Sequence, residues 1–209
     1  MTRTFRPITP ERLIDELADR IAGTRRQGAA LRVAIDGAAA AGTATFAAEL
    51  VAPLRERGCP ATVVRAETFW RDASLRLEYG HEDPDAFLHW LDVPALRREV
   101  LDPLGPSGVG RFLPSLRDPA TNRATRATPI DAEPNAVVLV AGALLFGSGL
   151  PFDYTVHLAL TSGAVRRRTP SGEQWTLPAL ASYERETRPA DLADLVVRLD
   201  DPARPAVGG

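Results

Sequence analysis

Short apolar runs alternate with segments of helical spacing along this chain. Residues 31–36 and 136–140 are apolar runs that end at or near glycines, as buried strands do. Further runs of this kind occupy residues 61–66, 154–159 and 195–199. Strands that alternate with helices predict a mostly parallel sheet of about five strands, covered by helices on both faces.

The predicted helices are recognised by apolar residues three or four positions apart. Thr9 and Pro10 are typical of a helix start, and Leu13, Leu17 and Ile21 then give one apolar face. Residues 43–57 repeat this spacing. We expect further helices at 92–101 and 177–188, and one that follows the strand at 154–159 and runs through residue 168. Residues 102–126 are rich in Pro, Gly and Arg, which predicts a loop or hairpin.

Length fits one principal domain, since the chain has 209 residues. We expect an N-terminal amphipathic helix packed on the core (1–28), a main domain (29–200) and a C-terminal tail (201–209). The near-neutral net charge of -2 lacks the excess of positive charge that is typical of nucleic-acid-binding proteins. The apolar runs are too short for a membrane span, and the start lacks a signal peptide's apolar core, so we expect a cytoplasmic protein.

All 25 cationic side chains are arginines, and the chain contains no lysine. Every mechanism that needs a lysine of this chain, including Schiff-base chemistry, is therefore excluded. The single Cys59 excludes a disulfide scaffold. His81, His89 and His157 have no metal-ligand spacing with Cys59, so we predict no metal site, and His157 is expected to be a hydrogen-bonded core histidine.

A glycine-rich turn follows the first predicted strand. Gly37 and Gly42 have the spacing of a phosphate-binding loop, in which backbone N–H groups and a helix N-terminus hold phosphate. The lysine position holds Thr43, and the Mg²⁺-ligand position holds Ala44, so this Walker A motif is degenerate. A tight turn without nucleotide is the alternative. The candidate loop comprises Gly37, Ala38, Ala39, Ala40, Ala41, Gly42, Thr43, Ala44 and Thr45.

Seven separate pieces then agree in order and spacing with one family. They are Leu31-Arg-Val-Ala-Ile-Asp-Gly37, Glu67-Thr-Phe-Trp70, Glu82-Asp-Pro-Asp-Ala-Phe87, Ala95-Leu-Arg-Arg98, Leu101-Asp-Pro-Leu-Gly-Pro106, Val137-Val-Leu-Val-Ala-Gly142 and Ala193-Asp-Leu-Val-Val197. The chain resembles the uridine kinase-like P-loop kinases of the phosphoribulokinase/uridine kinase branch. The resemblance implies a P-loop NTPase-like three-layer α/β/α sandwich.

The resemblance also assigns roles to individual residues. It places Glu67 as the base that accepts a proton from a nucleoside hydroxyl, and Glu82 and Asp85 near the ribose. Trp70 is a candidate for the wall of the substrate cleft, with Trp90 beside it. The implied lid arginines are Arg166, Arg167 and Arg168. For Glu67 the alternative is an exposed glutamate at a strand end, and for Asp85 it is an ordinary helix start. For the tryptophans the alternative is packing in the aromatic core or at its rim, and for the three arginines it is a solvated helix end.

The departures from the family concern its phosphate chemistry. Besides the loop lysine and hydroxyl, the acidic residue at the end of the third core strand is replaced, by Ala141. A pseudokinase that binds a ligand or a partner protein is therefore one hypothesis, with no certain cofactor. A divergent phosphotransferase that uses ATP and Mg²⁺, with Glu67 as base, is the alternative, and an unrelated α/β binding protein is a third. The expected ligand is a nucleotide, nucleoside or other phosphate-containing small molecule; the sequence predicts no oligomeric state.

Overall fold

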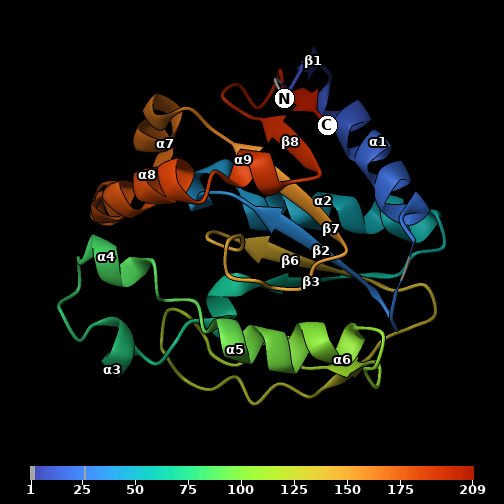
Figure 1. The fold of residues 1–209 in the computed structure, drawn as a ribbon, viewed down its shortest axis with the longest axis horizontal. Helices are drawn as coiled ribbons and strands as arrows, with labels where there is room; N and C mark the ends of the chain where they lie inside the picture. Colours follow the sequence, from blue (N-terminus) through green and yellow to red (C-terminus); the bar gives the residue numbers. More distant parts are fainter. Residues whose placement is uncertain (1–2, 26) are drawn as a thin grey trace.

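The computed structural model describes residues 3–25 and 27–209. Seven strands form its main sheet: β1 (Arg6–Pro7), β2 (Leu31–Asp36), β3 (Ala61–Arg65), β6 (Val137–Gly142), β7 (Tyr154–Ala159), β8 (Leu195–Arg198) and β9 (Ala206–Gly208). Their order is β1-β9-β8-β7-β2-β6-β3 (Figure 1). The five strands from β8 to β3 are parallel, which confirms the predicted sheet. The antiparallel edge strands β9 and β1 were not predicted.

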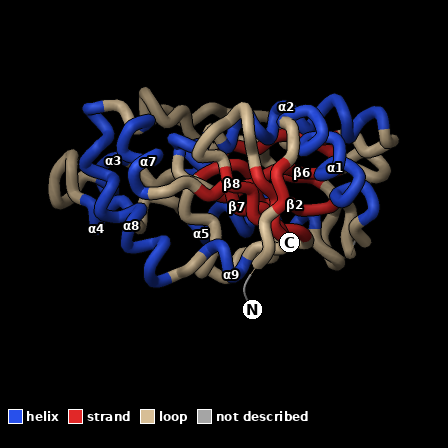
Figure 2. The backbone as a smooth tube through the Cα atoms, turned by 90° about the horizontal axis from the view of Figure 1, so that it is seen from above, coloured by secondary structure: helices blue, strands red, loops and turns tan. Residues whose placement is uncertain are grey.

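Helices cover both faces of this sheet (Figures 1 and 2). They are α1 (Pro10–Gly23), α2 (Thr43–Glu56), α3 (Ala73–Arg76), α4 (Pro84–Phe87), α5 (Val93–Leu96), α6 (Asp102–Leu104), α7 (Ser162–Arg168), α8 (Leu177–Glu186) and α9 (Pro189–Leu192). Short turns η1 (Ala39–Ala41), η2 (Ala66–Phe69) and η4 (Ser171–Thr176) are 3₁₀, and η3 (Arg97–Leu101) is a π-helical turn. Strands β4 (Arg111–Phe112) and β5 (Ile130–Asp131) form a separate hairpin.

One face of the sheet packs against α1 and α2. Thr9 caps α1 through its side-chain oxygen, and Pro10 occupies the first turn, where its missing N–H is not needed. Leu17 and Ile21 of α1 and Leu50 and Leu54 of α2 are fully buried against the strands. Their spacing of four places them on one side of each helix, as the sequence pattern predicted.

The other face packs against α5, η3 and α6, which run on from one another. Leu96, Leu101 and Leu104 are fully buried there, together with Val138 and Val140 of β6. Because alternate residues of β6 point to opposite faces, Val137 and Leu139 belong to the α1–α2 side instead. The molecule is therefore the three-layer α/β/α sandwich that the sequence predicted.

A buried ion pair joins the start of β2 to Asp153, the residue just before β7. Arg32, in the central strand, donates from Nε and Nη2 to the two carboxylate oxygens of Asp153, at 2.9 and 2.7 Å. The backbone N–H of Arg32 donates to the same carboxylate, and Nη1 donates to the Leu101 carbonyl. Both side chains of the pair are less than a tenth exposed. The fork of the guanidinium is thus almost fully satisfied, which permits a charged residue in the core.

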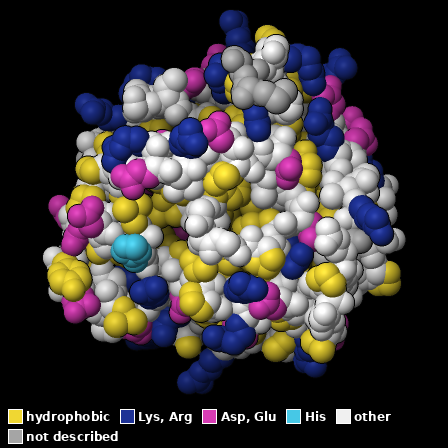
Figure 3. Space-filling model, viewed as in Figure 1, with side chains coloured by type: hydrophobic (Ala, Val, Ile, Leu, Met, Phe, Trp, Pro, Cys, Tyr) yellow, Lys and Arg dark blue, Asp and Glu magenta, His cyan; other side chains and the backbone are white. Residues whose placement is uncertain are grey.

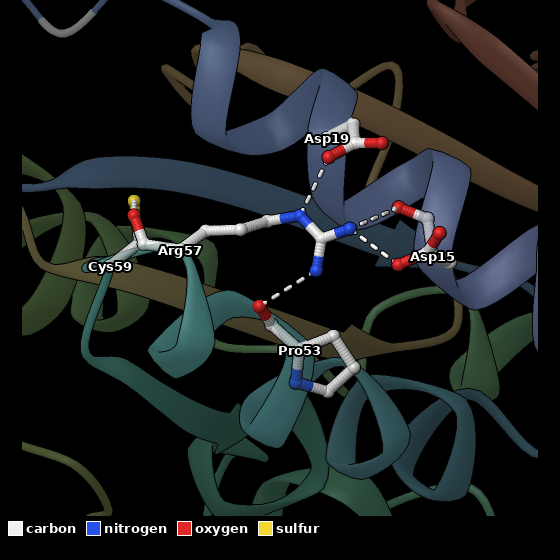
Figure 4. A network of polar contacts seen from close by, with 5 residues as sticks. All are labelled: Asp15, Asp19, Pro53, Arg57 and Cys59. Carbon is white, nitrogen blue, oxygen red and sulfur yellow. Dashed lines mark hydrogen bonds and ion pairs between the residues drawn. The ribbon is translucent and has the colours of Figure 1, made fainter.

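Arg57, just after α2, ties this helix to α1 (Figure 4). Its guanidinium donates to the carboxylates of Asp15 and Asp19, one turn apart on α1, and to the carbonyl of Pro53. Both aspartates are mostly exposed, so this network lies at the surface, above the apolar contact between the helices.

The last residues of the chain lie against the sheet. β9 falls within the segment expected as a tail, and its Val207 is buried opposite Val197. None of the helices in the described residues combines the length and apolar character that a membrane span requires. Arginine and acidic side chains are interspersed over the face shown in Figure 3.

Candidate functional site

A cavity of about 620 Å³ lies at the carboxyl ends of the parallel strands. Its walls come from the loop after β2, the η2 turn after β3, the residues after β6, and the α7–η4 segment (residues 162–176). The register of the sheet explains this convergence, because Asp36 pairs with both Gly142 and His157. In open parallel sheets, ligands bind at this edge.

The candidate phosphate loop borders the cavity through Ala39 and Ala40. Gly37 has φ +156°, and a Cβ there would come within 2.8 Å of the Leu158 carbonyl oxygen. Gly42 has φ +73°, the left-handed region that glycine adopts without strain. Both glycines are therefore required by the turn itself, whether or not the loop holds a ligand.

Several N–H groups of this loop are bonded within the protein. Ala41 donates to the carbonyl of Ala38 at 2.8 Å, and Gly42 donates to that of Ala39 at 2.9 Å. Gly37 donates to the Gly142 carbonyl at 3.1 Å. A phosphate-binding loop depends on N–H groups that converge on the anion. Three of this loop's donors are directed elsewhere.

The last three residues of the candidate loop do not line the cavity. Thr43 is 3% exposed and packs beneath the loop, with its methyl group towards Gly37. Ala44 has no polar side chain, and Thr45 is exposed on the outer side of α2. Ala141 is buried in the sheet and has only a methyl group to offer. Within the described residues, no three His, Cys, Asp or Glu side chains converge to form a metal site. These positions do not fit a Mg²⁺–nucleotide complex.

Glu67 lies at the cavity wall, in the η2 turn directly after β3. Its side chain is 20% exposed, and Nε of Arg65 lies 3.7 Å from Oε2. Within the described chain, this buried Oε2 has no hydrogen-bond partner. Burial raises the pKa of the Glu67 carboxyl, although Arg65 partly opposes this. Glu67 therefore lines the cavity, while its Oε2 is covered by protein atoms.

Aromatic rings make a second wall, and all three tryptophans of the chain belong to it. Trp70 and Trp90 meet edge to face at 5.1 Å between ring centroids. Trp175 from η4 lies 5.3 Å from Trp90 and 5.6 Å from Phe87. Each ring except the buried Trp90 is partly exposed. We name these four residues the aromatic wall.

Of the expected lid arginines and ribose-binding residues, some lie at the cavity and others lie outside it. Arg168 lines the cavity, and its Nη2 donates to the Asp200 carbonyl at 2.7 Å. Arg166 and Arg167 are exposed on α7 and do not line it. Glu82 and Asp85 are exposed as well, outside the cavity, and Asp85 lies in the first turn of α4, whose cap is Asp83.

Other cavity residues were not identified from the sequence. Trp175 lies far along the chain from the other aromatic residues, and Arg65 and Glu173 stand in ordinary strand-end and turn positions. Leu144 lines the cavity with φ +64°, a conformation that is rare for a leucine. The signal that pointed to this wall was the position of Trp70 and Trp90, which flank pieces that resemble the kinase family.

Comparison with solved structures shows the same architecture elsewhere. A protein described as a possible uridine kinase, from Bacillus stearothermophilus, is 22% identical, with a TM-score of 0.71 over 89% of this chain and 97% of its own. A candidate kinase of a fructose transport system from Silicibacter sp. TM1040 is 20% identical, with a TM-score of 0.59 over 89% and 95%. The YGR205w protein is 9% identical, with a TM-score of 0.53 over 96% and 99%.

These likenesses confirm the P-loop kinase-like fold that the sequence pieces indicated. No model of a known protein family matches the sequence. No curated protein matches it either. At these identities the likeness concerns the fold, and the chemistry of the cavity is argued from its own residues.

Proposed function

We propose that this chain is a kinase-fold binding protein, a pseudokinase that holds a small molecule in the cavity without transferring phosphate from ATP. The observation that carries the proposal is the loop. Thr43 is buried where a lysine would reach phosphate, and the Ala41 and Gly42 N–H groups are bonded inside the loop. We propose that the protein works in the cytoplasm and that its ligand is a nucleoside, a nucleotide or a similar small molecule.

Phosphoryl transfer depends on positioning and on neutralising the charge of the transferred group. The loop offers no lysine and no hydroxyl at Ala44, and the sheet offers no carboxylate at Ala141. Loss of one electrostatic stabiliser typically costs about 3 kcal/mol of transition-state stabilisation. Three such losses, although not additive, leave little support for ATP-dependent chemistry.

Calorimetric titration tests this proposal directly. ATP, ADP, GTP and a set of nucleosides are titrated with and without Mg²⁺. We expect no saturable binding of Mg²⁺–ATP at millimolar concentration, and saturable binding of at least one uncharged nucleoside-like compound. Tight binding of Mg²⁺–ATP would contradict the proposal.

Restoration of the loop gives a complementary test. The double variant Thr43→Lys with Ala44→Ser supplies the missing cation and hydroxyl. Thr43→Met with Ala44→Ser is the matched control, since methionine has similar length without charge. Nucleotide binding in the first variant alone would show that the loop is an eroded phosphate site.

A divergent phosphotransferase is the second candidate function, and one observation favours it. Glu67 and Arg168 line the same cavity, which brings a carboxyl group and a guanidinium to one ligand space. Glu67 would accept the proton of a ligand hydroxyl, and Arg168 would offset negative charge. This function predicts ATP-dependent phosphorylation that disappears in Glu67→Gln and persists in Glu78→Gln, a control at an exposed position outside the cavity. Unchanged turnover in Glu67→Gln would remove Glu67 from the mechanism.

A further inference from the structure

Arg76 lies against the aromatic wall without lining the cavity. Its guanidinium carbon is 4.6 Å from the ring centroid of Trp90 and 5.2 Å from that of Trp70, within the range of cation–π contacts. Nε donates to the carbonyl of Arg71 at 2.9 Å, and the Trp90 indole N–H donates to the Arg76 carbonyl at 3.2 Å. The arginine and the two rings therefore form one fixed unit.

This guanidinium is a buried cation without a carboxylate partner. Arg76 is 8% exposed, and no acidic side chain in the described residues forms an ion pair with it. Asp72, at the start of the same helix, pairs with Arg117 at 3.1 Å instead. Burial lowers the pKa of Arg76, with Asp72 opposing the change, but an arginine keeps its charge at every physiological pH.

The position of the cation changes what the aromatic wall can bind. Without Arg76, exposed indole rings beside Glu67 and Glu173 would resemble an aromatic cage for an ammonium ligand. Here the π-electrons of Trp70 and Trp90 already interact with a guanidinium. A cationic ligand on the cavity side would have a weaker cation–π attraction to these rings, and Arg76 would repel it directly. An uncharged, electron-rich ring meets neither penalty.

We propose that Arg76 is a specificity-determining residue that makes the cavity select flat, electron-rich aromatic ligands and reject cationic ones. The ligand ring would pack on the partly exposed members of the aromatic wall, Trp70, Phe87 and Trp175. This inference rests on the proposed ligand-binding function and names its ligand class. It requires no phosphate on the ligand.

A matched series of naphthalenes tests the selection in the unaltered protein. Calorimetry compares 2-naphthol, which is neutral, with 2-naphthylmethylammonium, which has the same ring system and a positive charge. We expect 2-naphthol to bind about tenfold more tightly, or better. Equal or tighter binding of the ammonium compound would overturn the inference, while the proposed binding function would stand.

Arg76→Met then assigns the preference to the guanidinium. The ratio between the dissociation constants of the two compounds should shrink by about tenfold in this variant. It should persist in Arg76→Lys, which keeps the charge, and in Arg71→Met, which removes an exposed neighbouring arginine. An unchanged ratio of dissociation constants in folded Arg76→Met overturns the inference. If Arg76→Met fails to fold, the order of affinities in the unaltered protein and in Arg76→Lys still decides.

Failure of both naphthalenes to bind also overturns the inference. The proposed function is judged separately, by the nucleotide and nucleoside titrations described above. The two failures are therefore distinguishable, because a nucleoside that binds while neither naphthalene does would leave the binding function intact.

Discussion

Nδ1 of His157 lies 2.8 Å from Oδ2 of Asp36, in the interior of the sheet. The two residues are register partners on the neighbouring parallel strands β7 and β2, and neither side chain is more than 1% exposed. The other oxygen of Asp36 accepts the N–H of Leu145 at 3.0 Å, from the loop after β6. The N–H of Phe146 donates to the Tyr183 hydroxyl at 3.0 Å. The residues that border the candidate loop and the cavity wall are thus held by one buried polar network.

His157 makes the stability of the protein depend on pH. Burial alone would lower the pKa of its imidazole, but Asp36 and the nearby Glu184 carboxylate outweigh burial and raise this pKa to about 9. In the unfolded chain the pKa is near its ordinary value of about 6.5. The stabilising contribution, up to about 3 kcal/mol, is therefore complete below about pH 6.5 and is lost as pH rises through 9.

Thermal unfolding between pH 6 and pH 9.5 measures this contribution. We expect the midpoint to fall by several degrees over that range. His157→Gln should flatten the curve, whereas the exposed His89→Gln should leave it unchanged. The same fall in His157→Gln would assign the pH dependence to other groups.

The buried pair of Arg32 and Asp153 offers a test of the sheet's interior. Asp153→Ala leaves a guanidinium that is less than a tenth exposed without its carboxylate. Removal of one partner from such a pair costs about 3–5 kcal/mol of folding free energy. Urea unfolding monitored by circular dichroism should show this loss as a lower midpoint with an unchanged slope.

The matched control is Glu16, which pairs at the surface with both Arg6 and Arg12. Glu16→Gln should shift the midpoint little, since exposed ion pairs are solvated and screened. Equal effects of Asp153→Ala and Glu16→Gln would mean that burial does not set the value of the Arg32–Asp153 pair.

The sequence predicted the interior of the fold because its strands are buried on both faces. Every residue of β2 and β6 is buried, so β6 is a continuous apolar run, and β2 is one apart from Arg32 and Asp36, which have polar partners inside the protein. The edge strands carry no such pattern: both residues of β1 are exposed, and β9 follows a proline-rich stretch. Their pairing depends on contacts between the two ends of the chain, which local periodicity does not encode.

The candidate site was predictable where its residues follow strands directly. Glu67 and the Gly37–Gly42 turn lie at the cavity because parallel strands end at one edge. Trp175 escaped notice because its contacts with Phe87 and Trp90 join segments far apart in the sequence. The cation behind the rings, Arg76, has an unremarkable sequence context, and only the tertiary structure places it beside two tryptophans.

Glu67 should be unfavourable for stability while it is ionised. Burial raises the pKa of its carboxyl, so the folded state binds this proton more tightly than the unfolded chain does. Stability therefore decreases as pH rises from about 4.3 through the raised pKa. Glu67→Gln removes the buried charge, and we expect it to stabilise the protein by about 1 kcal/mol at pH 7.

Thermal unfolding at pH 4.5 and pH 7.5 checks this expectation. Glu67→Gln should unfold at a higher temperature than the unaltered protein at pH 7.5, and the difference should narrow at the lower pH. Glu78→Gln, at an exposed position, should show neither effect. A destabilised Glu67→Gln would mean that the carboxylate has a structural partner.

Trp175 is the aromatic link between the α7–η4 segment and α4. Its ring meets Phe87 at 81° and 5.6 Å, and it lies 5.3 Å from Trp90. Aromatic pairs contribute about 0.5–1.5 kcal/mol each beyond the area they bury. Trp175→Ala should therefore destabilise the protein by roughly 2 kcal/mol, and Trp175→Phe by less. Hydrogen exchange should accelerate in residues 162–176 and in α4 in Trp175→Ala, because each segment loses a contact that holds it over the cavity. Exchange in β2 and β6 should stay slow in both variants, and acceleration there instead would show that Trp175 supports the whole core rather than this one junction.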